Sequence, residues 1–165
     1  MIVVTGSAGY IGGQTVIELK KAGHSVIGID IRDHSAYITE QLDVVIKEDF
    51  ISELALGVIV NEKPDAIIHC AGSSLVGPSN VDPSTYYENN FVKTKILADV
   101  LLHNGLHDTR LVFSSSASVY GEPALSGGRS CFANKPIWRD QTNGRNATEQ
   151  LPKCIWVTKR NTQIL

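Results

Sequence analysis

The chain has 165 residues, of which 17 are acidic, 15 are basic and three are cysteines, and its formal net charge is −2. This length fits a single domain with a substantial core, and a near-neutral charge without runs of like charges argues against nucleic acid or a membrane surface as a partner. Since no apolar run approaches the roughly 18 residues of a membrane span and the cysteines lack metal-ligand spacing, we expect a cytoplasmic protein without a metal centre.

Short apolar runs and amphipathic stretches alternate along the first two thirds of the chain. Residues 2–5 are mostly β-branched and end at Gly6, as a buried parallel strand does. A helix should follow over residues 10–22, where apolar positions share one face and Gly23 provides a C-terminal cap. Further strands are predicted over residues 25–30, 43–49, 65–70 and 110–116, and further helices over residues 51–62 and 83–105.

This order of elements predicts an α/β fold with a Rossmann-like, doubly wound and mostly parallel sheet. The pattern stops after Gly121, because residues 121–150 collect glycine, proline, serine, asparagine and arginine without an apolar period of either kind. We therefore divide the chain into a Rossmann-like domain over residues 1–123 and an aberrant or disordered tail over residues 124–165.

Three glycines lie between the first predicted strand and the first predicted helix. Gly6, Gly9 and Gly12 occur in the stretch TGSAGYIGG. In this context Gly6 permits a tight turn, Gly9 lets the backbone approach a pyrophosphate, and Gly12 lets the helix lie close to the sheet. The helix N-terminus supplies free amide groups for an anion. The spacing therefore predicts a dinucleotide site, with a glycine-rich turn that binds no ligand as the alternative.

Asp30 ends the second predicted strand about 20 residues after the glycines. A carboxylate there can accept hydrogen bonds from the ribose hydroxyls of the adenosine half, and it would repel a 2′-phosphate. The sequence thus favours NAD over NADP, although Arg32 lies nearby and a capping role for Asp30 is the alternative. Asp49, near the end of the next strand, is a weaker candidate for contacting the adenine.

Four stretches taken together, TGSAGYIG, IIHCAG, YYENN and FSSSASVYG, resemble the extended short-chain dehydrogenase/reductases. Among these they are most similar to the NAD-dependent epimerase/dehydratase family and its UDP-glucose 4-epimerases. The resemblance covers roughly residues 1–123. It implies NAD as the cofactor, a UDP-sugar as the substrate and a homodimer as the assembly.

The resemblance also implies site residues, position by position. It assigns the pyrophosphate to the glycine loop, the adenosine ribose to Asp30, the adenine to Asp49 and the nicotinamide side to Asn89. Ser116, the third serine of FSSS, would be the catalytic hydroxyl. The cofactor-binding positions that it implies are Gly6, Gly9, Tyr10, Ile11, Gly12, Asp30, Asp49, Ala71, Gly72 and Asn89.

Enzymes of this kind carry a Tyr-x-x-x-Lys pair on the next helix. The lysine lowers the pKa of the tyrosine, which takes a proton from the sugar 4-hydroxyl while a hydride passes to NAD and later returns to the other face of the sugar. No such pair follows Ser116 in this chain, and we expect the substrate-binding lobe of the family to be absent. Lys93 and Ser74 also replace residues common in the family. We therefore expect the chain as written to be inactive, and its dimerisation is in question.

Residues 136–146, PIWRDQTNGRN, lie where the catalytic helix is due. Shifting the permitted codons of this region by one nucleotide admits a segment of the form Asn-Pro-Tyr-Gly-x-Thr-Lys, with tyrosine and lysine at the required spacing. Our hypothesis is a single-base slip near Leu125 or Ser126, which would make residues 124–165 a frameshift product. A divergent loop and a genuine truncated isoform are the alternatives.

By family, then, the sequence predicts an NAD-dependent nucleotide-sugar epimerase that interconverts UDP-glucose and UDP-galactose. A related nucleotide-sugar dehydratase or reductase is a second hypothesis, although the elimination of water needs an acid pair that SSSASVYG lacks. The third hypothesis is an NAD-binding fragment without catalysis.

Overall fold

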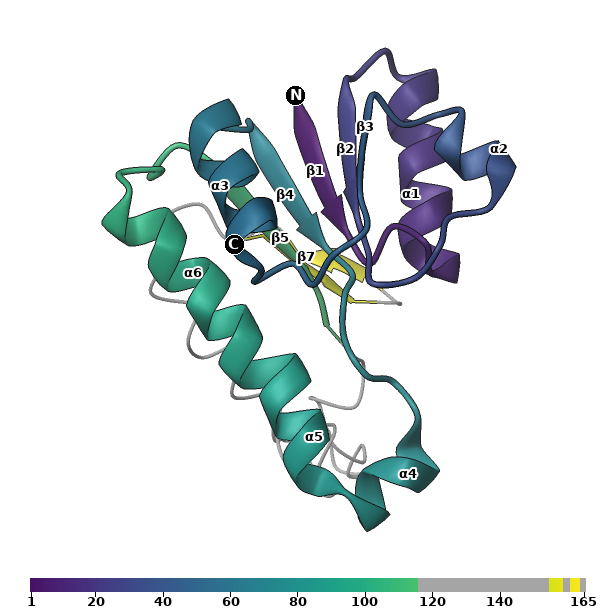
Figure 1. Cartoon of the computed structure of the whole chain (residues 1–165), viewed down its shortest axis with the longest axis vertical. Helices are drawn as coiled ribbons and strands as arrows, with labels where there is room; N and C mark the ends of the chain where they lie inside the picture. Colours follow the sequence, from purple (N-terminus) through teal and green to yellow (C-terminus); the bar gives the residue numbers. More distant parts are fainter. Residues whose placement is uncertain (116–154, 159–160, 164–165) are drawn as a thin grey trace.

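The computed structural model describes residues 1–115, 155–158 and 161–163 (Figure 1). The strands are β1 (Ile2–Thr5), β2 (Val26–Ile29), β3 (Val44–Ile46), β4 (Ala66–His69), β5 (Arg110–Ser114), β6 (Ile155–Thr158) and β7 (Asn161–Gln163). The helices are α1 (Tyr10–Lys21), α2 (Ala36–Thr39), α3 (Glu53–Glu62), α4 (Val76–Val81), α5 (Pro83–Tyr87), the π-helical η1 (Glu88–Val92) and α6 (Lys93–His103). None of these helices is long and apolar enough to cross a membrane.

The described strands form one sheet in the order β3-β2-β1-β4-β5-β6-β7. Every neighbouring pair is parallel except β6 and β7, which are antiparallel. The winding reverses at β1, where Thr5 is in register with Ile29 of β2 on one side and with His69 of β4 on the other. The predicted doubly wound parallel sheet is confirmed, and its switch point lies between β1 and β4.

Two strands of the sheet come from the stretch that the sequence predicted to be irregular. β6 pairs with β5, and β7 pairs with β6, so both extend the sheet on the side away from β1. The other residues of the predicted tail lie outside the described residues. The predicted domain boundary at residue 123 and the catalytic candidate Ser116 lie outside them as well.

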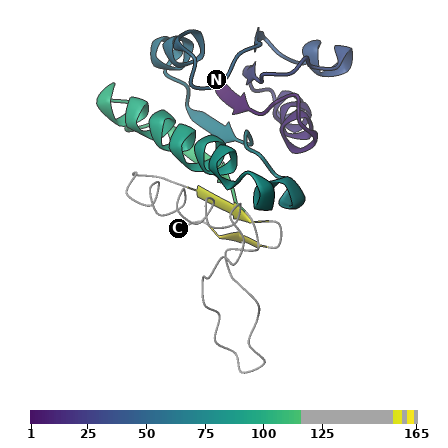
Figure 2. The ribbon, with the colours of Figure 1, turned by 60° about the horizontal axis from the view of Figure 1, so that its bottom comes forward.

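Alternate residues of the central strands face opposite helical layers. Val3 and Ile67 belong to the apolar cluster that includes residues of α3 and α6, whereas Val4 packs in a second cluster with Val16 of α1. Figures 1 and 2 show α1 on one side of the sheet and α3 and α6 on the other. Both faces of β1 and β2 are therefore buried, which explains why these strands are apolar without alternation.

The single helix predicted over residues 83–105 is divided into α5, η1 and α6 in the structure. α5 begins at Pro83, directly after Asp82, whose carboxylate accepts a hydrogen bond from a first-turn amide. The π-helical turn η1 then connects it to α6, and Gly105 follows at a φ of 70°. π-Helical turns inside α-helices are frequent at functional sites. The prediction missed this turn because periodicity does not distinguish i+4 from i+5 hydrogen bonding over five residues.

A buried histidine links the end of β4 to the start of α6. His69 is 1% exposed, and its Nδ1 and Nε2 atoms lie 2.6 Å from Thr5 Oγ1 and 2.9 Å from Thr94 Oγ1. The Thr94 hydroxyl donates to the carbonyl of Asn90, so Nε2 carries the proton and donates to Thr94, while Nδ1 accepts from Thr5. Burial lowers the pKa of His69 to about 4. The histidine is therefore neutral at physiological pH.

This depressed pKa predicts a loss of stability in mild acid. The unfolded chain binds a proton at His69 as the pH falls through 6.5, whereas the folded chain does so only near 4. The contribution is complete above pH 6.5, and we expect the free energy of unfolding to fall by about 2 kcal/mol between pH 7 and 5. Urea denaturation at several pH values measures this change.

The controls are His69→Gln and His34→Gln, because burial also lowers the pKa of the half-buried His34. We expect the pH dependence to flatten in His69→Gln and to persist largely in His34→Gln. An unchanged slope in His69→Gln would contradict the assignment. If that variant does not fold, the NMR titration of the His69 ring in the unmodified protein gives its pKa directly.

Candidate functional site

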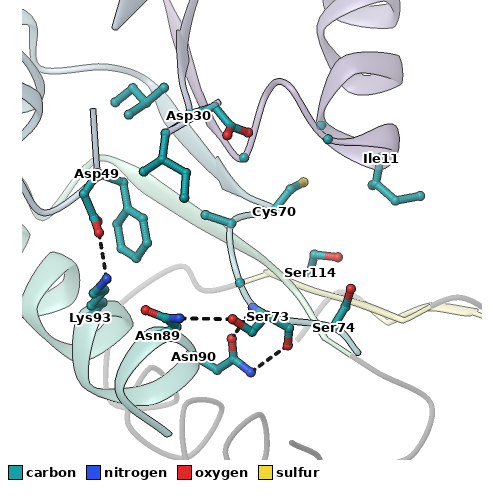
Figure 3. A pocket seen from close by; sticks show the side chains of 18 of the residues that line it. Ile11, Asp30, Asp49, Cys70, Ser73, Ser74, Asn89, Asn90, Lys93 and Ser114 are labelled. Carbon is teal, nitrogen blue, oxygen red and sulfur yellow. Dashed lines mark hydrogen bonds and ion pairs between the residues drawn. The ribbon is translucent and has the colours of Figure 1, made fainter. Parts of the chain in front are cut away.

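The carboxyl ends of the central strands surround a cleft with a volume of about 660 Å³ (Figure 3). Its walls come from the loops after β1, β2, β3 and β4, from η1, and from the end of β5. Ligands in doubly wound folds bind in the crevice at this place, where the winding reverses. The cleft is thus both the expected position and a suitable size for an extended ligand.

The glycine loop forms one wall of the cleft and leaves no room for a side chain at Gly6 or Gly12. Gly6 has a φ of 72°, and a Cβ atom there would lie 2.6 Å from the amide nitrogen of Ala71. A Cβ atom at Gly12 would lie 2.1 Å from the carbonyl oxygen of Gly6. Gly6 therefore makes the tight turn, and Gly12 lets α1 approach the loop, as their spacing predicted.

The N-terminus of α1 opens onto this wall. Gly9 is the N-cap and supplies no side chain to the first-turn amides, and no acidic residue lies in that turn. Tyr10, Ile11 and Gly12 line the cleft directly after it. The first amides of an α-helix lack partners within the helix, and the helix dipole makes this end positive. The geometry can therefore hold an anion such as a pyrophosphate.

Asp30 lies at the end of β2 and is almost completely buried. One carboxylate oxygen accepts from the amide of Ala8 at 3.0 Å, and the other accepts from the amide of Arg32 at 2.9 Å and from its Nε at 3.3 Å. The carboxylate thus fixes the glycine loop to the turn after β2. This is the capping role given as an alternative. It leaves one lone pair, on the oxygen that Ala8 contacts, for a ligand in the cleft that Asp30 lines.

Asp49 lies after β3 and forms an ion pair across the cleft wall. Its Oδ2 lies 2.7 Å from Nζ of Lys93 on α6, and its Oδ1 accepts from the amide of Ile51 at 3.2 Å. The side chains of Asp49 and Lys93 are 33% and 20% exposed, so the pair is partly shielded from solvent. Both residues line the cleft, and Figure 3 shows the contact.

Two adjacent asparagines of η1 hold the loop after β4. The side chain of Asn90 accepts from the amide of Ser73 at 2.7 Å and donates to the Ser73 carbonyl at 3.0 Å, as a neighbouring strand would. Asn89 donates to Ser73 Oγ at 3.1 Å (Figure 3). A Cβ atom at Gly72 would lie 2.9 Å from Asn90 Oδ1, so this approach needs glycine. These hydrogen bonds hold the loop after β4 in place as the floor of the cleft.

Cys70 and the serines at the end of β5 complete the floor of the cleft. Burial raises the pKa of the Cys70 thiol to about 11, with a smaller opposing effect from a hydrogen bond with Thr15. The thiol is therefore protonated at neutral pH and is a poor nucleophile. Ser114 and Ser115 line the cleft, and the next residue, Ser116, lies outside the described part of the chain.

The structure brings together all ten cofactor-binding candidates on the wall of this one cleft. Sequence reasoning chose Asn89 but missed Asn90, which makes the stronger contacts with Ser73. It noted Lys93 only as a departure and gave it no position in the site. The paired asparagines in YYENN were an available signal for Asn90, whereas nothing local to residue 93 indicates its contact with Asp49.

Comparisons with known proteins agree with this geometry. Residues 2–142 match the model of the NAD dependent epimerase/dehydratase family. UDP-glucose 4-epimerase 2 of Arabidopsis thaliana is 40% identical over 156 residues, a match that covers 87% of this chain and 43% of that protein. UDP-glucose 4-epimerase of Neisseria meningitidis serogroup C is 34% identical over 131 residues, covering 74% of this chain and 38% of that protein. The chain thus spans less than half the length of these relatives.

Solved structures give the same result. UDP-glucose 4-epimerase of Stenotrophomonas maltophila, with bound NAD and formylated UDP-arabinopyranose, matches with a TM-score of 0.82 and 26% identity over 95% of this chain and 51% of that one. The enzyme of Brucella ovis in complex with NAD matches with a TM-score of 0.81 and 25% identity, over 95% and 50% of the two chains.

The steric limit at Gly12 predicts opposite effects of the same substitution at two helical glycines. Gly57→Ala in α3 adds a Cβ atom with nothing within 4 Å, so we expect about 0.5–1 kcal/mol of stabilisation. Gly12→Ala forces a Cβ atom against backbone and should destabilise the fold by about 3 kcal/mol. Urea denaturation measures both, and equal effects would contradict the close packing of α1.

The hydrogen bonds that clamp Ser73 predict different losses of stability when Asn89 or Asn90 is replaced. Asn90→Ala removes two hydrogen bonds that join a buried side chain to the half-buried peptide groups of Ser73, and we expect it to lower the free energy of unfolding by about 2–3 kcal/mol. Asn89→Ala removes one bond from a half-buried side chain and should cost less than about 1 kcal/mol. Urea denaturation compares the variants; a larger loss for Asn89→Ala would show that the clamp is assigned to the wrong residue.

Proposed function

Because the chain belongs to the NAD dependent epimerase/dehydratase family, we propose that its cleft binds NAD and is the cofactor-binding part of a site for the epimerisation of a nucleotide sugar. The observation that carries the proposal is the gathering of ten residues, chosen from the sequence as cofactor-binding positions, around one cleft at the switch point of the sheet. NAD supplies reversible hydride transfer at such a site. The protein supplies binding and orientation.

The glycine loop fits the pyrophosphate of NAD. The backbone approach at Gly6 and Gly12 excludes side chains from the space in front of α1, and the uncapped first turn of α1 offers amide groups to the anion. No described acidic side chain lies in that turn to repel a phosphate. These features support the pyrophosphate position that was inferred from the TGSAGYIGG spacing.

Asp30 fits the adenosine ribose. Its carboxylate is held in place by the amides of Ala8 and Arg32, so the lone pair that remains on Oδ2 is oriented before a ligand arrives. A 2′-phosphate there would face a buried negative charge, which favours NAD over NADP. The Arg32 side chain, 64% exposed and paired with Asp30, reduces that repulsion without removing it.

For the substrate we propose a UDP-sugar, with interconversion at the sugar 4-position. The Arabidopsis and Neisseria relatives are UDP-glucose 4-epimerases by name. In this proposal the Ser116 hydroxyl would assist proton removal from the 4-hydroxyl, and bound NAD would supply the reversible acceptance of hydride from the same carbon. The dehydratase hypothesis is weaker, because SSSASVYG contains no acid to promote the loss of water.

We propose that the 165-residue chain binds NAD but does not turn over a UDP-sugar. None of its five tyrosines has a lysine four positions later, so the chain as written lacks the tyrosine base of the family pattern. A frame slip near residue 125 would account for this, and resequencing the coding DNA across codons 120–150 tests it. An NAD-binding fragment without catalysis is the second candidate.

The proposal predicts NAD binding that depends on Asp30. We expect isothermal titration calorimetry of the full chain to detect binding of NAD and weaker binding of NADP. We expect a turnover assay to show no conversion of UDP-glucose to UDP-galactose. Asp30→Asn should weaken NAD binding roughly tenfold and reduce the preference over NADP, because the charge that meets the ribose is lost.

Asp33→Asn is the matched control, since Asp33 is 81% exposed, pairs with Lys47 and does not line the cleft. It should leave NAD binding unchanged. Absence of NAD binding by the unmodified chain would overturn the cofactor assignment, and measurable turnover of the sugar would overturn the assignment of inactivity.

A further inference from the structure

The Asp49–Lys93 pair differs from the surface ion pairs of the protein. Lys95 and Asp99 pair within α6, where both side chains are about half exposed and neither lines the cleft. Lys93 lies only two residues earlier, yet it joins α6 to the end of β3 and is 20% exposed. An exposed pair adds little to stability, whereas charges at the wall of a concave site act on whatever binds there.

The two charged groups present a donor and an acceptor side by side. Lys93 Nζ has three protons and uses one on Asp49 Oδ2, so protons remain for another acceptor. Each oxygen of Asp49 receives one described hydrogen bond, from Lys93 or from the amide of Ile51, and keeps a lone pair. The carboxylate cannot turn away easily, because both oxygens are held.

This arrangement complements the edge of an adenine base. Adenine carries an amino group that donates, flanked by ring nitrogens that accept. With the ribose at Asp30, a base in this cleft extends toward the end of β3, where Asp49 and Lys93 lie (Figure 3). A carboxylate alone could bind only the amino group of the adenine, whereas the ion pair can bind the amino group and an adjacent ring nitrogen.

We propose that Lys93 is an adenine-recognition residue: its ammonium donates to a ring nitrogen beside the amino group, while Asp49 accepts from the amino group itself. The proposal rests on NAD binding in the cleft. In this proposal Lys93 contributes to specificity for the base, and its ion pair holds Asp49 in the orientation that the base requires. The sequence analysis assigned the adenine to Asp49 alone.

The test is a thermodynamic cycle on the full 165-residue chain, in which one change is made in the protein and the other in the ligand. Calorimetry measures the dissociation constants of NAD and of two analogues, in which N1 or N7 of the adenine is replaced by C–H. For the unmodified chain we expect one of the two analogues to bind roughly tenfold more weakly than NAD. For Lys93→Met we expect NAD to be weakened by a similar factor, with no further loss for that analogue.

Two further variants separate recognition from folding. Lys95→Met makes the same substitution on the same helix away from the cleft and should leave every dissociation constant unchanged. Lys93→Arg keeps a cationic donor and should recover most of the affinity for NAD and the discrimination against the analogue. Thermal unfolding followed by circular dichroism checks that the variants are folded.

The outcomes distinguish this proposal from the cofactor proposal. If the unmodified chain binds NAD and both analogues equally, or if Lys93→Met keeps the full discrimination, the adenine role of Lys93 is overturned while NAD binding stands. If the unmodified chain binds no NAD, the cofactor proposal falls and this one falls with it. Should Lys93→Met fail to fold, the analogue series on the unmodified chain and Lys93→Arg decides the question.

Discussion

The contact between the loop after β1 and the first turn of α1 is the constraint on which the site depends. The carbonyl oxygen of Gly6 occupies the space where a Cβ atom at Gly12 would lie, and Gly6 itself lies against the peptide that joins Cys70 to Ala71. Three segments therefore meet with only backbone between them. Their contact places the positive end of α1 over the point where the sheet reverses its winding.

A chain of polar side chains connects this point to the helical layer. The amide of Ala71 donates to Thr5, Thr5 to His69, His69 to Thr94, and Thr94 to the carbonyl of Asn90. The side chain of Asn90 then returns to the loop after β4 through the peptide groups of Ser73. A buried network in which each of these groups has a partner favours one arrangement over its alternatives. A ligand thus meets a floor that is already ordered, and binding need not include the entropic cost of ordering it.

The acidic residues of the cleft share a common design. Asp30 and Asp49 follow adjacent strands, and each combines backbone amide donors with a basic side chain: two amides and Arg32 for Asp30, one amide and Lys93 for Asp49. A carboxylate held in this way keeps its negative charge, and an oxygen that has a single amide or ammonium partner can still accept another hydrogen bond. The two acids can therefore serve the local fold and the proposed ligand at once, which is why a structural role for Asp30 does not compete with its binding role.

The sequence by itself determined the features that depend on neighbouring residues. The alternation of strands and helices, the glycine spacing and the position of Asp30 at a strand end follow from local sterics and periodicity, and they located the glycine loop and Asp30. The resemblance to a known family added the other candidates, and all ten line one cleft. Only the tertiary structure decided the π-helical turn, the choice of Asn90 as the clamp, the pairing of Lys93 with a residue 44 positions earlier, and the extension of the sheet by β6 and β7. The reason is physical: these features depend on how far a helix is rotated about its axis and on which segments lie beside one another, and neither quantity is set by the residues within a single element.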